Sequence, residues 1–464
     1  MTQFGRTRRI HFVGVGGIGM SGIAELLVNL GYGVSGSDAK RSDVTDRLSA
    51  LGVGVAIGHD AANVGEADVV VVSSAIRPDN PEVAAARSRH VPVIARAEML
   101  AELMRLRFGI AIAGAHGKTT TTSMVALALE RAGLDPTAVI GGRLSAFGSN
   151  ARLGQGRYMV VEADESDRSF LKLSPSIAVI TNIDREHMES YGTFDRLLDA
   201  FVDFADKVPF YGAVVACIDD PHVRSILPRL SRRVITYGFS EDADVRGLHA
   251  TTDGRGGRCD VQQGVLTVGV PGLHNLLNAL AAVAVGLELG VPFDRLAAAL
   301  AEFRGADRRY QLKGVVGGVT VIDDYGHHPT EIAAVLRAAR AGAPRRVVAV
   351  FQPHRYSRTR DLLAEFGRVL ADADVTLLTD IYPAGEAPIA GVTSAAIAAA
   401  VQMHGRGTVE LVPALDEVPS RVADIAADGD VVLTLGAGSI GAVAGKIVAA
   451  LQARAAARAQ AVGR

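Results

Sequence analysis

The stretch that most constrains the fold of this chain is GIAIAGAHGKTTTTSMVALALERAGL, which begins at Gly109. An apolar run of strand type reaches Gly114, and shortly afterwards Gly117-Lys118-Thr119 opens a segment of helical periodicity. Backbone N–H groups of a glycine turn at a helix N-terminus form an anion site, and a lysine adds positive charge there. The pattern therefore predicts a strand–loop–helix unit that binds the phosphates of a nucleotide.

This loop is shorter than the common phosphate loop, which has four residues between its glycines. Only Ala115 and His116 separate Gly114 from Gly117, so a strand-to-helix turn with a surface lysine is the alternative. The flanking strand and helix favour phosphate binding, and so does the rarity of lysine, because the whole chain has six. The residues expected around the phosphates are Gly114, Ala115, His116, Gly117, Lys118, Thr119 and Thr120.

The length of the chain and its short apolar runs predict several α/β domains. A chain of 464 residues is too long for one core, and small aliphatic strands alternate with helical segments throughout. We expect three domains, which cover residues 1–107, 108–310 and 311–464. Glycine turns between short alternating runs at residues 251–272 predict a small β insertion in the second domain.

Composition excludes several classes of function. A formal net charge of -2 argues against a nucleic-acid coat or a polybasic membrane surface. Cys217 and Cys259 provide neither a disulfide framework nor metal-ligand spacing. The first ten residues lack an apolar signal core, and no run reaches the length of a membrane span. We therefore expect a cytoplasmic enzyme without a nucleic-acid partner or a stable membrane association.

Acidic residues follow the strand-like run YMVV, at a place where parallel sheets gather their ligands. Glu162 comes first after the run, and Asp164, Glu165 and Asp167 follow it. A hard cation such as Mg²⁺ takes oxygen ligands of this kind, although a solvated acidic turn is the alternative. Glu162 is the best candidate ligand, with the Thr119 hydroxyl as its partner. His187 follows the next strand and is a candidate for a second metal contact.

Polar residues elsewhere offer further contacts to a nucleotide or an anion. Asn275 and Asn278 share one helix face, where they either contact a nucleotide or form a cap and a polar surface. Arg308 and Arg309 lie at the seam between the second and third domains, where they could clamp phosphate. Two loops of the third domain are candidates for gripping an anion. Their polar residues are Asp323, Asp324, Tyr325, His327 and His328, then His354, Arg355, Arg358 and Arg360.

Two G-x-G-x-x-G stretches occur, and each alone is a weak signal. Gly436, Gly438 and Gly441 are most simply a tight strand–helix turn. The first stretch, at 14–19, is followed one strand later by Asp38, as in a dinucleotide site that binds ribose. A nicotinamide-dependent oxidoreductase is therefore a rival hypothesis, although it leaves the phosphate loop unexplained. A non-enzymatic ATP-binding switch is another.

Taken together, the motifs resemble the Mur ligase family over nearly the full length, from about Ile10 to Ile447. They are GVGGIGMSGIAE, GAHGKTTTTS, EADESDRSF, TNIDREHM, HNLLNALAA, FRGADRR, DDYGHHPTEI and FQPHRYSRTRD, in this order. The resemblance implies a Rossmann-like domain for a UDP-sugar, a P-loop ATPase-like central domain and a Rossmann-like domain on the amino-acid side. It also explains the short loop, because this family uses GxxGK[ST].

The resemblance narrows to the alanine-adding branch or its murein-recycling relative, which attaches a peptide. It implies an ATP- and Mg²⁺-dependent ligase of peptidoglycan precursor synthesis. That ligase would join L-alanine to the lactyl carboxylate of UDP-N-acetylmuramate through an acyl phosphate, giving ADP and phosphate. We expect a monomer or a homodimer.

The resemblance also implies roles for single residues. The implied catalytic residues are Lys118, Glu162, His187, Asn278, Arg308 and Asp324. Asn275, Arg308 and Asp324 would reach ATP, Thr119 and Glu162 would hold one Mg²⁺, and His187 would help hold a second. The implied UDP-sugar contacts are Gly16, Gly17, Gly19, Met20, Ser37, Asp38, His59, Ser73 and Ser74. The implied amino-acid side consists of Tyr325, His327, Arg355 and Arg358.

One departure from the family pattern concerns the second metal ion. Several relatives carry a carbamylated lysine after the HM segment that braces this ion. Residues 195–204, DRLLDAFVDF, contain no lysine, and Lys207 lies too far along the chain. Either the second metal ion lacks this brace or another group replaces it.

Overall fold

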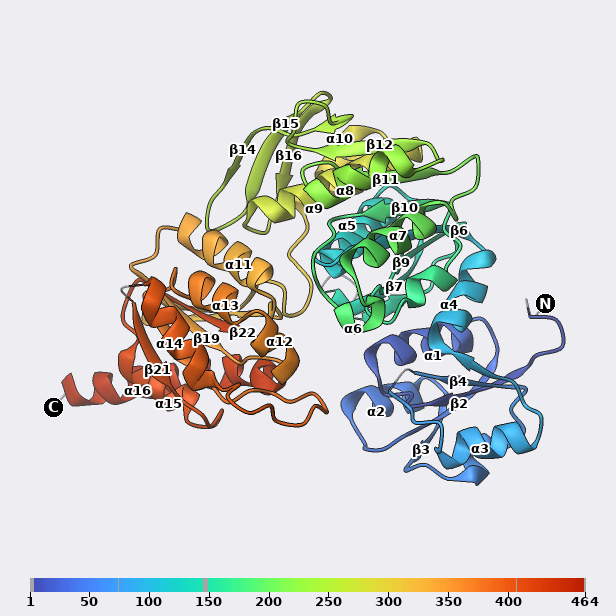
Figure 1. Ribbon diagram of the computed structural model, residues 1–464, viewed down its shortest axis with the longest axis horizontal. Helices are drawn as coiled ribbons and strands as arrows, with labels where there is room; N and C mark the ends of the chain where they lie inside the picture. The colour runs from blue at the N-terminus through green and yellow to red at the C-terminus, as the bar shows by residue number, and fades with distance from the viewer. Residues whose placement is uncertain (1–3, 74, 145–148, 406, 463–464) are drawn as a thin grey trace. The chain divides into compact units, whose positions relative to one another are not determined.

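A computed structural model describes residues 4–73, 75–144, 149–405 and 407–462 (Figure 1). The chain divides into two compact units. The first consists of Met1–His249, Cys259–Thr267 and Leu276–Arg304, and the second of Ala250–Arg258, Val268–Asn275 and Gly305–Arg464.

The first sheet of the first unit is parallel, with the strand order β3-β2-β1-β4-β5. Its strands are β1 (Arg9–Val13), β2 (Gly33–Asp38), β3 (Gly54–Ile57), β4 (Val69–Val72) and β5 (Val93–Ala95). The helices between them are α1 (Ile18–Asn29), α2 (Asp43–Ala50), η1 (Ala61–Val64), α3 (Pro81–Ser88) and α4 (Arg96–Arg105). Strand order reverses between β1 and β4, which is where such sheets bind ligands.

The second sheet of this unit has the order β13-β12-β11-β10-β6-β9-β7-β8 and is parallel in its centre. Its strands are β6 (Phe108–Ala113), β7 (Thr137–Leu144), β8 (Ser149–Arg152), β9 (Tyr158–Glu162), β10 (Ile177–Ile180), β11 (Ala213–Cys217), β12 (Val234–Gly238) and β13 (Val245–Arg246). Because β6 lies between β9 and β10, the loops that follow these three strands meet at one edge.

Helices cover both faces of this sheet, so its central strands are continuous apolar runs. The helices of this part of the unit are α5 (Lys118–Arg131), η2 (Ser169–Lys172), α6 (Met188–Tyr191), α7 (Phe194–Ala205), α8 (Pro221–Ile226), η3 (Leu227–Arg229) and α10 (Phe293–Ala301). Helix α5 packs against β6, β7, β9 and α10 and is buried from Thr119 to Leu129. Its first turn is therefore held rigidly at the end of β6.

The predicted β insertion is present as a three-stranded sheet with the order β14-β15-β16. Its strands are β14 (Leu248–Thr252), β15 (Gly257–Val261) and β16 (Gly264–Val268), and α9 (Leu273–Glu288) follows.

The second unit contains a sheet with the order β17-β18-β22-β19-β20-β21, in which only the β17–β18 pair is antiparallel among the described residues. Its strands are β17 (Gln311–Val316), β18 (Val319–Asp324), β19 (Arg346–Phe351), β20 (Val375–Leu378), β21 (Thr408–Leu411) and β22 (Asp430–Leu435). Its helices are α11 (Pro329–Ala341), α12 (Tyr356–Asp361), α13 (Leu363–Leu370), α14 (Ser394–His404), α15 (Val418–Ile425), η4 (Ser439–Ala442) and α16 (Val443–Val462). Apolar clusters fill both faces of the sheet.

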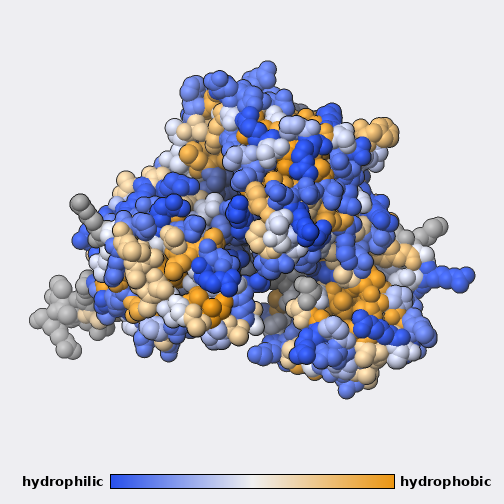
Figure 2. All heavy atoms as spheres, in the orientation of Figure 1, coloured by the Kyte–Doolittle hydropathy of each residue, from blue (hydrophilic) through white to orange (hydrophobic). Residues whose placement is uncertain are grey.

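Helix α16 corrects one expectation, that no segment reaches the length of a membrane span. In the described part of the chain, Ser439–Ala457 is long and apolar enough to cross a membrane by length and composition. Its apolar residues pack inside the protein: Val443, Ala444, Ile447 and Leu451 are buried in the core of the second unit. Hydrophilic residues cover most of the molecular face drawn in Figure 2.

The sheets confirm the predicted α/β class with its Rossmann-like and P-loop-like parts. Strand β6 begins at Phe108 and β17 at Gln311. The domain boundaries 1–107, 108–310 and 311–464 stay predictions.

Candidate active site

The glycines of the loop after β6 are required by its geometry. Gly114 has φ +136°, and a Cβ there would lie 2.1 Å from Thr181 Oγ1. Gly117 has φ +81° and caps α5, and a Cβ there would lie 2.7 Å from Asn278 Oδ1. Any side chain at either position would meet both backbone strain and a close neighbour. The short loop is therefore pressed tightly against the elements around it.

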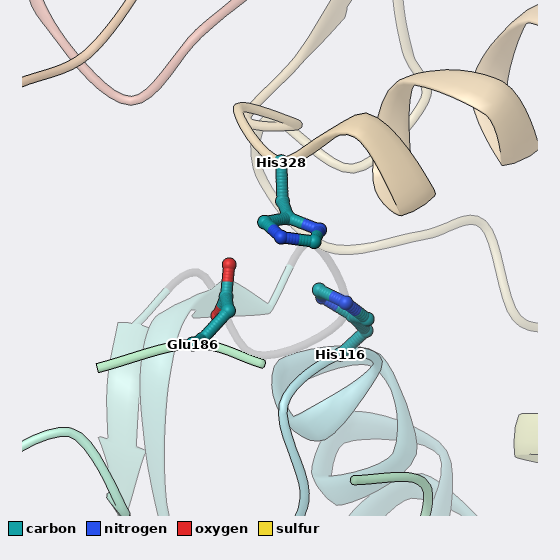
Figure 3. A group of neighbouring side chains, drawn as sticks. All are labelled: His116, Glu186 and His328. Atoms are coloured by element: carbon teal, nitrogen blue, oxygen red, sulfur yellow. The ribbon is translucent and has the colours of Figure 1, made fainter. Parts of the chain in front are cut away.

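Residues that follow β10 brace this loop. His116 N donates to Asn182 Oδ1 (2.8 Å), and His116 O accepts from Thr181 Oγ1 (2.7 Å) and Asn182 Nδ2 (2.9 Å). The His116 imidazole lies 2.9 Å from Asp184 Oδ2. Sequence reasoning missed Thr181 and Asn182, although polar residues directly after a buried strand are the signal that could have found them. Figure 3 shows His116 before the first turn of α5 and Glu186 on the loop after β10. The third labelled residue, His328, caps the N-terminus of α11 in the second unit.

Lys118 points inward, not to the surface as in the alternative of a simple turn. Its Nζ donates to the carbonyls of Gly114 (2.6 Å) and Ala115 (3.1 Å) and to Glu165 Oε1 (2.9 Å). Burial favours the neutral amine, but the carboxylates of Glu165 and its neighbours outweigh burial and raise the Lys118 pKa. The loop thus presents a mostly buried, positively charged ammonium group at the carboxyl ends of β6, β9 and β10.

Thr119 and Glu162 lie together, as a magnesium site needs. Strand pairing sets Glu162 opposite Ile112, near the end of β6. Thr119 Oγ1 lies 3.1 Å from each carboxylate oxygen of Glu162. A hydroxyl and a carboxylate are oxygen ligands of the kind that Mg²⁺ prefers, so the residues present fit this ion.

His187 has different neighbours from Thr119 and Glu162. It has φ +56°, a left-handed conformation that is uncommon for a residue with a side chain, and it immediately precedes α6. Its Nε2 lies 3.6 Å from Glu186 Oε2 and 4.0 Å from Glu165 Oε1. Ligand atoms of Glu165, Glu186 and His187 all lie within 4.8 Å of one another. The predicted metal residues therefore fall into two groups.

The two asparagines of α9 have different surroundings. Asn278 accepts from Thr121 Oγ1 at 3.1 Å and closely approaches Gly117, so it stands beside the phosphate loop. Asn275 belongs to the second unit, where its Nδ2 donates to Pro271 O at 2.7 Å.

The N-terminal glycine turn also lies at the end of a strand and the start of a helix. Gly17 caps α1, and Gly16 N donates to Asp38 Oδ2 at 2.9 Å. That bond engages the carboxylate which the nicotinamide hypothesis assigns to a ribose. A Cβ on Gly19 would lie 2.5 Å from Arg96 Nη1, so the arginine lies over the turn. Met20 is buried in the core.

Of the two adjacent serines predicted to contact the UDP-sugar after β4, only Ser73 lies within the described residues. Ser73 follows β4 near Gly14, where a Cβ on the glycine would lie 3.9 Å from Ser73 Oγ. Ser74 lies outside the described residues.

Glu82 organises this end of the first sheet, and sequence reasoning missed it. Its fully buried carboxylate accepts from Ser37 Oγ (2.7 Å) and Asn63 Nδ2 (3.0 Å) and contacts the imidazoles of His11 (3.0 Å) and His59 (3.3 Å). Burial alone would raise the Glu82 pKa, but hydrogen bonds from His11, Ser37 and Asn63 outweigh it and lower the pKa to about 2. Glu82 lies in the first turn of α3, where an acidic residue is common and signals no long-range role.

In the second unit, Arg308 and Asp324 lie at the carboxyl end of β18. Arg308 Nε donates to Asp323 Oδ2 (3.0 Å), and its Nη2 donates to Gly436 O (2.5 Å). The N–H groups of Tyr310 and Gly326 donate to Asp324 at 2.7 and 2.6 Å. Burial raises the Asp324 pKa to about 6, although these bonds oppose the shift.

Aromatic and imidazole rings form a row beside this pair. The centroid distances are 5.5 Å from Tyr325 to His327, 5.6 Å from His327 to His354 and 5.5 Å from His354 to Tyr382. Burial, with His327 and Arg358 nearby, lowers the His354 pKa to about 3.

The two predicted arginines, Arg355 and Arg358, lie close to this row of rings. Arg358 Nη1 lies 3.3 Å from His354 Nδ1. Arg355 has φ +72° and lies 4.0 Å from Glu386, which also accepts from Ser357 Oγ at 2.6 Å. The structure thus brings all four residues predicted for the amino-acid side to one end of the second unit's sheet, together with His354, which the sequence offered as an anion contact, and it adds Tyr382.

Comparisons with known proteins agree over almost the whole chain. The family descriptions "Mur ligase family, catalytic domain", "Mur ligase middle domain" and "Mur ligase, glutamate ligase domain" match residues 9–108, 112–286 and 308–438. The UDP-N-acetylmuramate–L-alanine ligase of Geobacter sulfurreducens is 55% identical over 449 residues, which are 94% of this chain and 96% of the relative.

Solved structures extend the similarity to three dimensions. A UDP-N-acetylmuramate–alanine ligase from Thermotoga maritima has a TM-score of 0.82 and 30% identity and covers 96% of this chain and 99% of its own. A murein peptide ligase from Psychrobacter arcticus has a TM-score of 0.70 and 25% identity and covers 96% and 98%. This protein is a member of the Mur ligase family, with the three domains that the family shares.

Proposed function

We propose that this chain is an ATP-dependent ligase that joins L-alanine to the lactyl carboxylate of UDP-N-acetylmuramate, giving ADP and phosphate in peptidoglycan precursor synthesis. The observation that carries the proposal is 55% identity, over 94% of the chain, to a relative that is named for this activity. The mostly buried Lys118 of the glycine loop supplies the positive charge that such a reaction needs.

The reaction requires a poor electrophile to be activated. A carboxylate oxygen attacks the γ-phosphorus of ATP, the bond to ADP breaks, and an acyl phosphate forms. The amine of L-alanine then attacks the acyl carbon, phosphate leaves, and the nitrogen loses a proton as the amide forms. Each step brings anionic oxygens together, so positive charge fixed in advance is the main catalytic resource.

Lys118 provides that charge in the first unit. We assign its ammonium group to the β- and γ-phosphates, with the N–H groups at the start of α5 around them. The Thr119 hydroxyl and the Glu162 carboxylate would hold Mg²⁺, which supplies charge neutralisation to the phosphate oxygens when bound. Asn278 keeps Thr121 and the loop in position through contacts that are already made.

We assign the other substrates to the ends of the two remaining large sheets. The N–H groups of the Gly16–Gly19 turn would face the UDP diphosphate, with Ser37, Asp38, His59 and the 73–74 serines around it. We also assign Asn275, Arg308 and Asp324 of the second unit to ATP. Tyr325, His327, Arg355 and Arg358 would bind the amino acid and the intermediate. We further propose that the enzyme works in the cytoplasm, as a monomer or a homodimer.

The second candidate is the recycling ligase, which attaches a preformed peptide to the same sugar nucleotide. The similarity to the murein peptide ligase of Psychrobacter arcticus favours it, but at 25% identity. The nicotinamide-dependent oxidoreductase and the non-enzymatic switch have less support, because neither explains the family membership.

Phosphate release from ATP in the presence of Mg²⁺ tests the proposal. UDP-N-acetylmuramate and L-alanine are omitted in turn, and L-Ala–D-Glu–diamino acid tripeptide replaces alanine in a parallel series. Release that needs both the sugar nucleotide and L-alanine supports the proposed ligase. Release with tripeptide but not with alanine moves the protein to the recycling branch, and release that ignores the sugar nucleotide contradicts both.

A further inference from the structure

The loop after β20 lies against the segment that follows β19. Strands β19 and β20 are parallel neighbours, so the chain leaves both of them at the same end of the sheet. Beyond the strands, Arg355 N donates to Tyr382 O at 2.8 Å, and Tyr382 N donates to Pro353 O at 2.8 Å. His354 and Tyr382 form a parallel bridge there, which continues the pairing of the two strands into their loops.

The side chain of Tyr382 strengthens this contact. Its ring stacks on the His354 imidazole with a centroid distance of 5.5 Å and an interplanar angle of 15°. A Cβ on Gly438 would lie 2.7 Å from Tyr382 Cγ, so the loop after β22 packs closely against the same residue. Three loops at this end of the sheet therefore meet at Tyr382, which gives the segment after β19 a fixed support.

Arg355 needs such support because of its backbone conformation. It has φ +72° and ψ 140°, outside the regions that residues with a side chain usually adopt. A conformation of this kind persists only where the surrounding structure holds it, and such conformations cluster at ligand sites. The chain turns here into α12, and Arg358 follows in that helix with its Nη1 3.3 Å from His354 Nδ1.

Glu386 holds the first turn of α12 from the loop after β20. Its Oε2 accepts from Ser357 N at 2.9 Å, its Oε1 accepts from Ser357 Oγ at 2.6 Å, and Arg355 Nη1 lies 4.0 Å from Oε1. Burial alone would raise the Glu386 pKa, but the hydrogen bonds from Ser357 and the charge of Arg355 lower it, so the carboxylate is ionised at neutral pH. The side chain is 26% exposed, so it lies outside the core of the unit.

The position of Glu386 bears on the two arginines of this segment. A guanidinium group binds a carboxylate more tightly when it is already oriented, because less freedom is lost on binding. The proposed function assigns Arg355 and Arg358 to the amino-acid side, and both belong to the segment that Glu386 tethers. Glu386 carries the same charge as the carboxylate of an amino acid, so it acts on that substrate through the arginines and not by direct contact.

We propose that Glu386 is a positioning residue for the amino-acid substrate, because it holds the first turn of α12 where Arg355 and Arg358 bind the carboxylate of the incoming amino acid. The inference rests on the proposed function, which places the amino acid beside these arginines. Loss of the tether weakens amino-acid binding and leaves ATP binding at the phosphate loop unchanged.

Steady-state phosphate release by the full chain, with each substrate varied in turn at saturating levels of the other two, tests the proposal. Glu386→Ala should raise the KM for L-alanine about tenfold or more and change the KM for ATP and for UDP-N-acetylmuramate by less than about twofold. Glu386→Gln keeps one acceptor oxygen for Ser357 and should lie between Glu386→Ala and the wild type. Asp361→Asn is the matched control, because Asp361 ends the same helix and is 58% exposed, and it should leave all three KM values unchanged.

A second substitution addresses the same contact from its other partner. Ser357→Ala removes the hydroxyl that donates to Glu386 Oε1 without changing any charge. It should also raise the KM for L-alanine, and Ser357→Ala combined with Glu386→Ala should be no worse than Glu386→Ala alone, because both act through one contact. Thermal unfolding of each variant checks that the fold is retained.

The outcomes separate the positioning role from the proposed function. An unchanged KM for L-alanine in Glu386→Ala, equal increases in all three KM values, or multiplied effects in the double variant would overturn the role of Glu386 and leave the proposed function standing. Wild-type protein that releases no phosphate with L-alanine would overturn the proposed function and this inference with it.

Discussion

Two buried glutamates of the first unit show how the same side chain can serve opposite purposes. Glu82 is fully buried and Glu165 is 3% exposed. Glu82 meets donors on both oxygens, from His11, Ser37 and Asn63 among others, and its pKa falls to about 2. Glu165 has Lys118 on one oxygen and no hydrogen-bond partner on the other, within the described residues, and its pKa rises.

The difference lies in donors and not in depth. Burial disfavours a charged carboxylate in both places, but several hydrogen bonds can reverse the shift. A carboxylate whose lone pairs are all used is fixed in place, and Glu82 accordingly joins β1, β2 and the loop after β3. A carboxylate with an unused lone pair and one movable partner is ready to exchange that partner for a ligand.

The largest effect on activity should follow from removing Lys118, the hydrogen-bond partner of Glu165. Lys118→Ala is expected to lower kcat/KM for ligation by about a thousandfold or more, because it deletes the charge that meets the phosphates. The fold should survive, as judged by circular dichroism. Steady-state phosphate release provides the rate, and Lys207→Ala, an exposed lysine of the same unit, is the control. Near-normal turnover in Lys118→Ala would remove the assignment of the phosphate loop.

Neutralising the satisfied glutamate should destabilise the N-terminal sheet. The fall in the Glu82 pKa from 4.5 to about 2 corresponds to roughly 3 kcal/mol, and Glu82→Gln should lose about that much at neutral pH. Hydrogen exchange of peptides that cover β1 and β2 measures the free energy of opening. Glu66→Gln, an exposed glutamate 79% accessible at its side chain, should leave exchange unchanged. An unaltered sheet in Glu82→Gln would refute the role of its hydrogen bonds.

Acid should gradually reduce the contribution of the Glu82 carboxylate to the free energy of opening. Because the Glu82 pKa is lower in the folded state, the unfolded chain binds more protons, and the free energy of opening falls as pH falls from about 4.5 towards 2. The difference between wild type and Glu82→Gln should therefore shrink to less than half by about pH 3. Exchange measured at several pH values, corrected for intrinsic rates, follows this change. A difference that does not depend on pH would contradict the assigned pKa.

The smallest effect is expected for Glu165, whose substitution should hardly change the stability of the sheet around β9. Glu165→Gln should change the free energy of opening near β9 by less than about 1 kcal/mol in the absence of nucleotide and metal, because burial raises the Glu165 pKa and so already disfavours the charge that the substitution removes. Hydrogen exchange of the β9 peptide measures it. A loss as large as that of Glu82→Gln would end the contrast between the two residues.

Local sequence patterns predicted many of the strands and helices. Apolar runs followed by glycine turns located β1 and β6, and helical periodicity located α1 and α5. The pairing of Thr119 with Glu162 could also be anticipated, because strands β6 and β9 end at the same edge. The C-terminal helix was harder, since a core helix and a membrane span share length and composition, and only packing separates them.

Long-range partners could not be read from the sequence. Glu82 lies 71 residues from His11 and 45 from Ser37, and nothing near it marks it as a hub. Thr181 and Asn182 brace a loop more than sixty residues away. Such contacts depend on which strands become neighbours, and the sequence pattern of a single strand does not say so.

By itself, the sequence determined the α/β class, the phosphate loop and the residue types of the candidate site, because these follow from periodicity, glycine conformation and local charge. Tertiary structure alone decided that Glu82 accepts hydrogen bonds on both carboxylate oxygens and that Glu165 accepts them on only one, within the described residues. The order of strands brings donors to Glu82 from several parts of one sheet, while it gives Glu165 one lysine and a buried, unused oxygen.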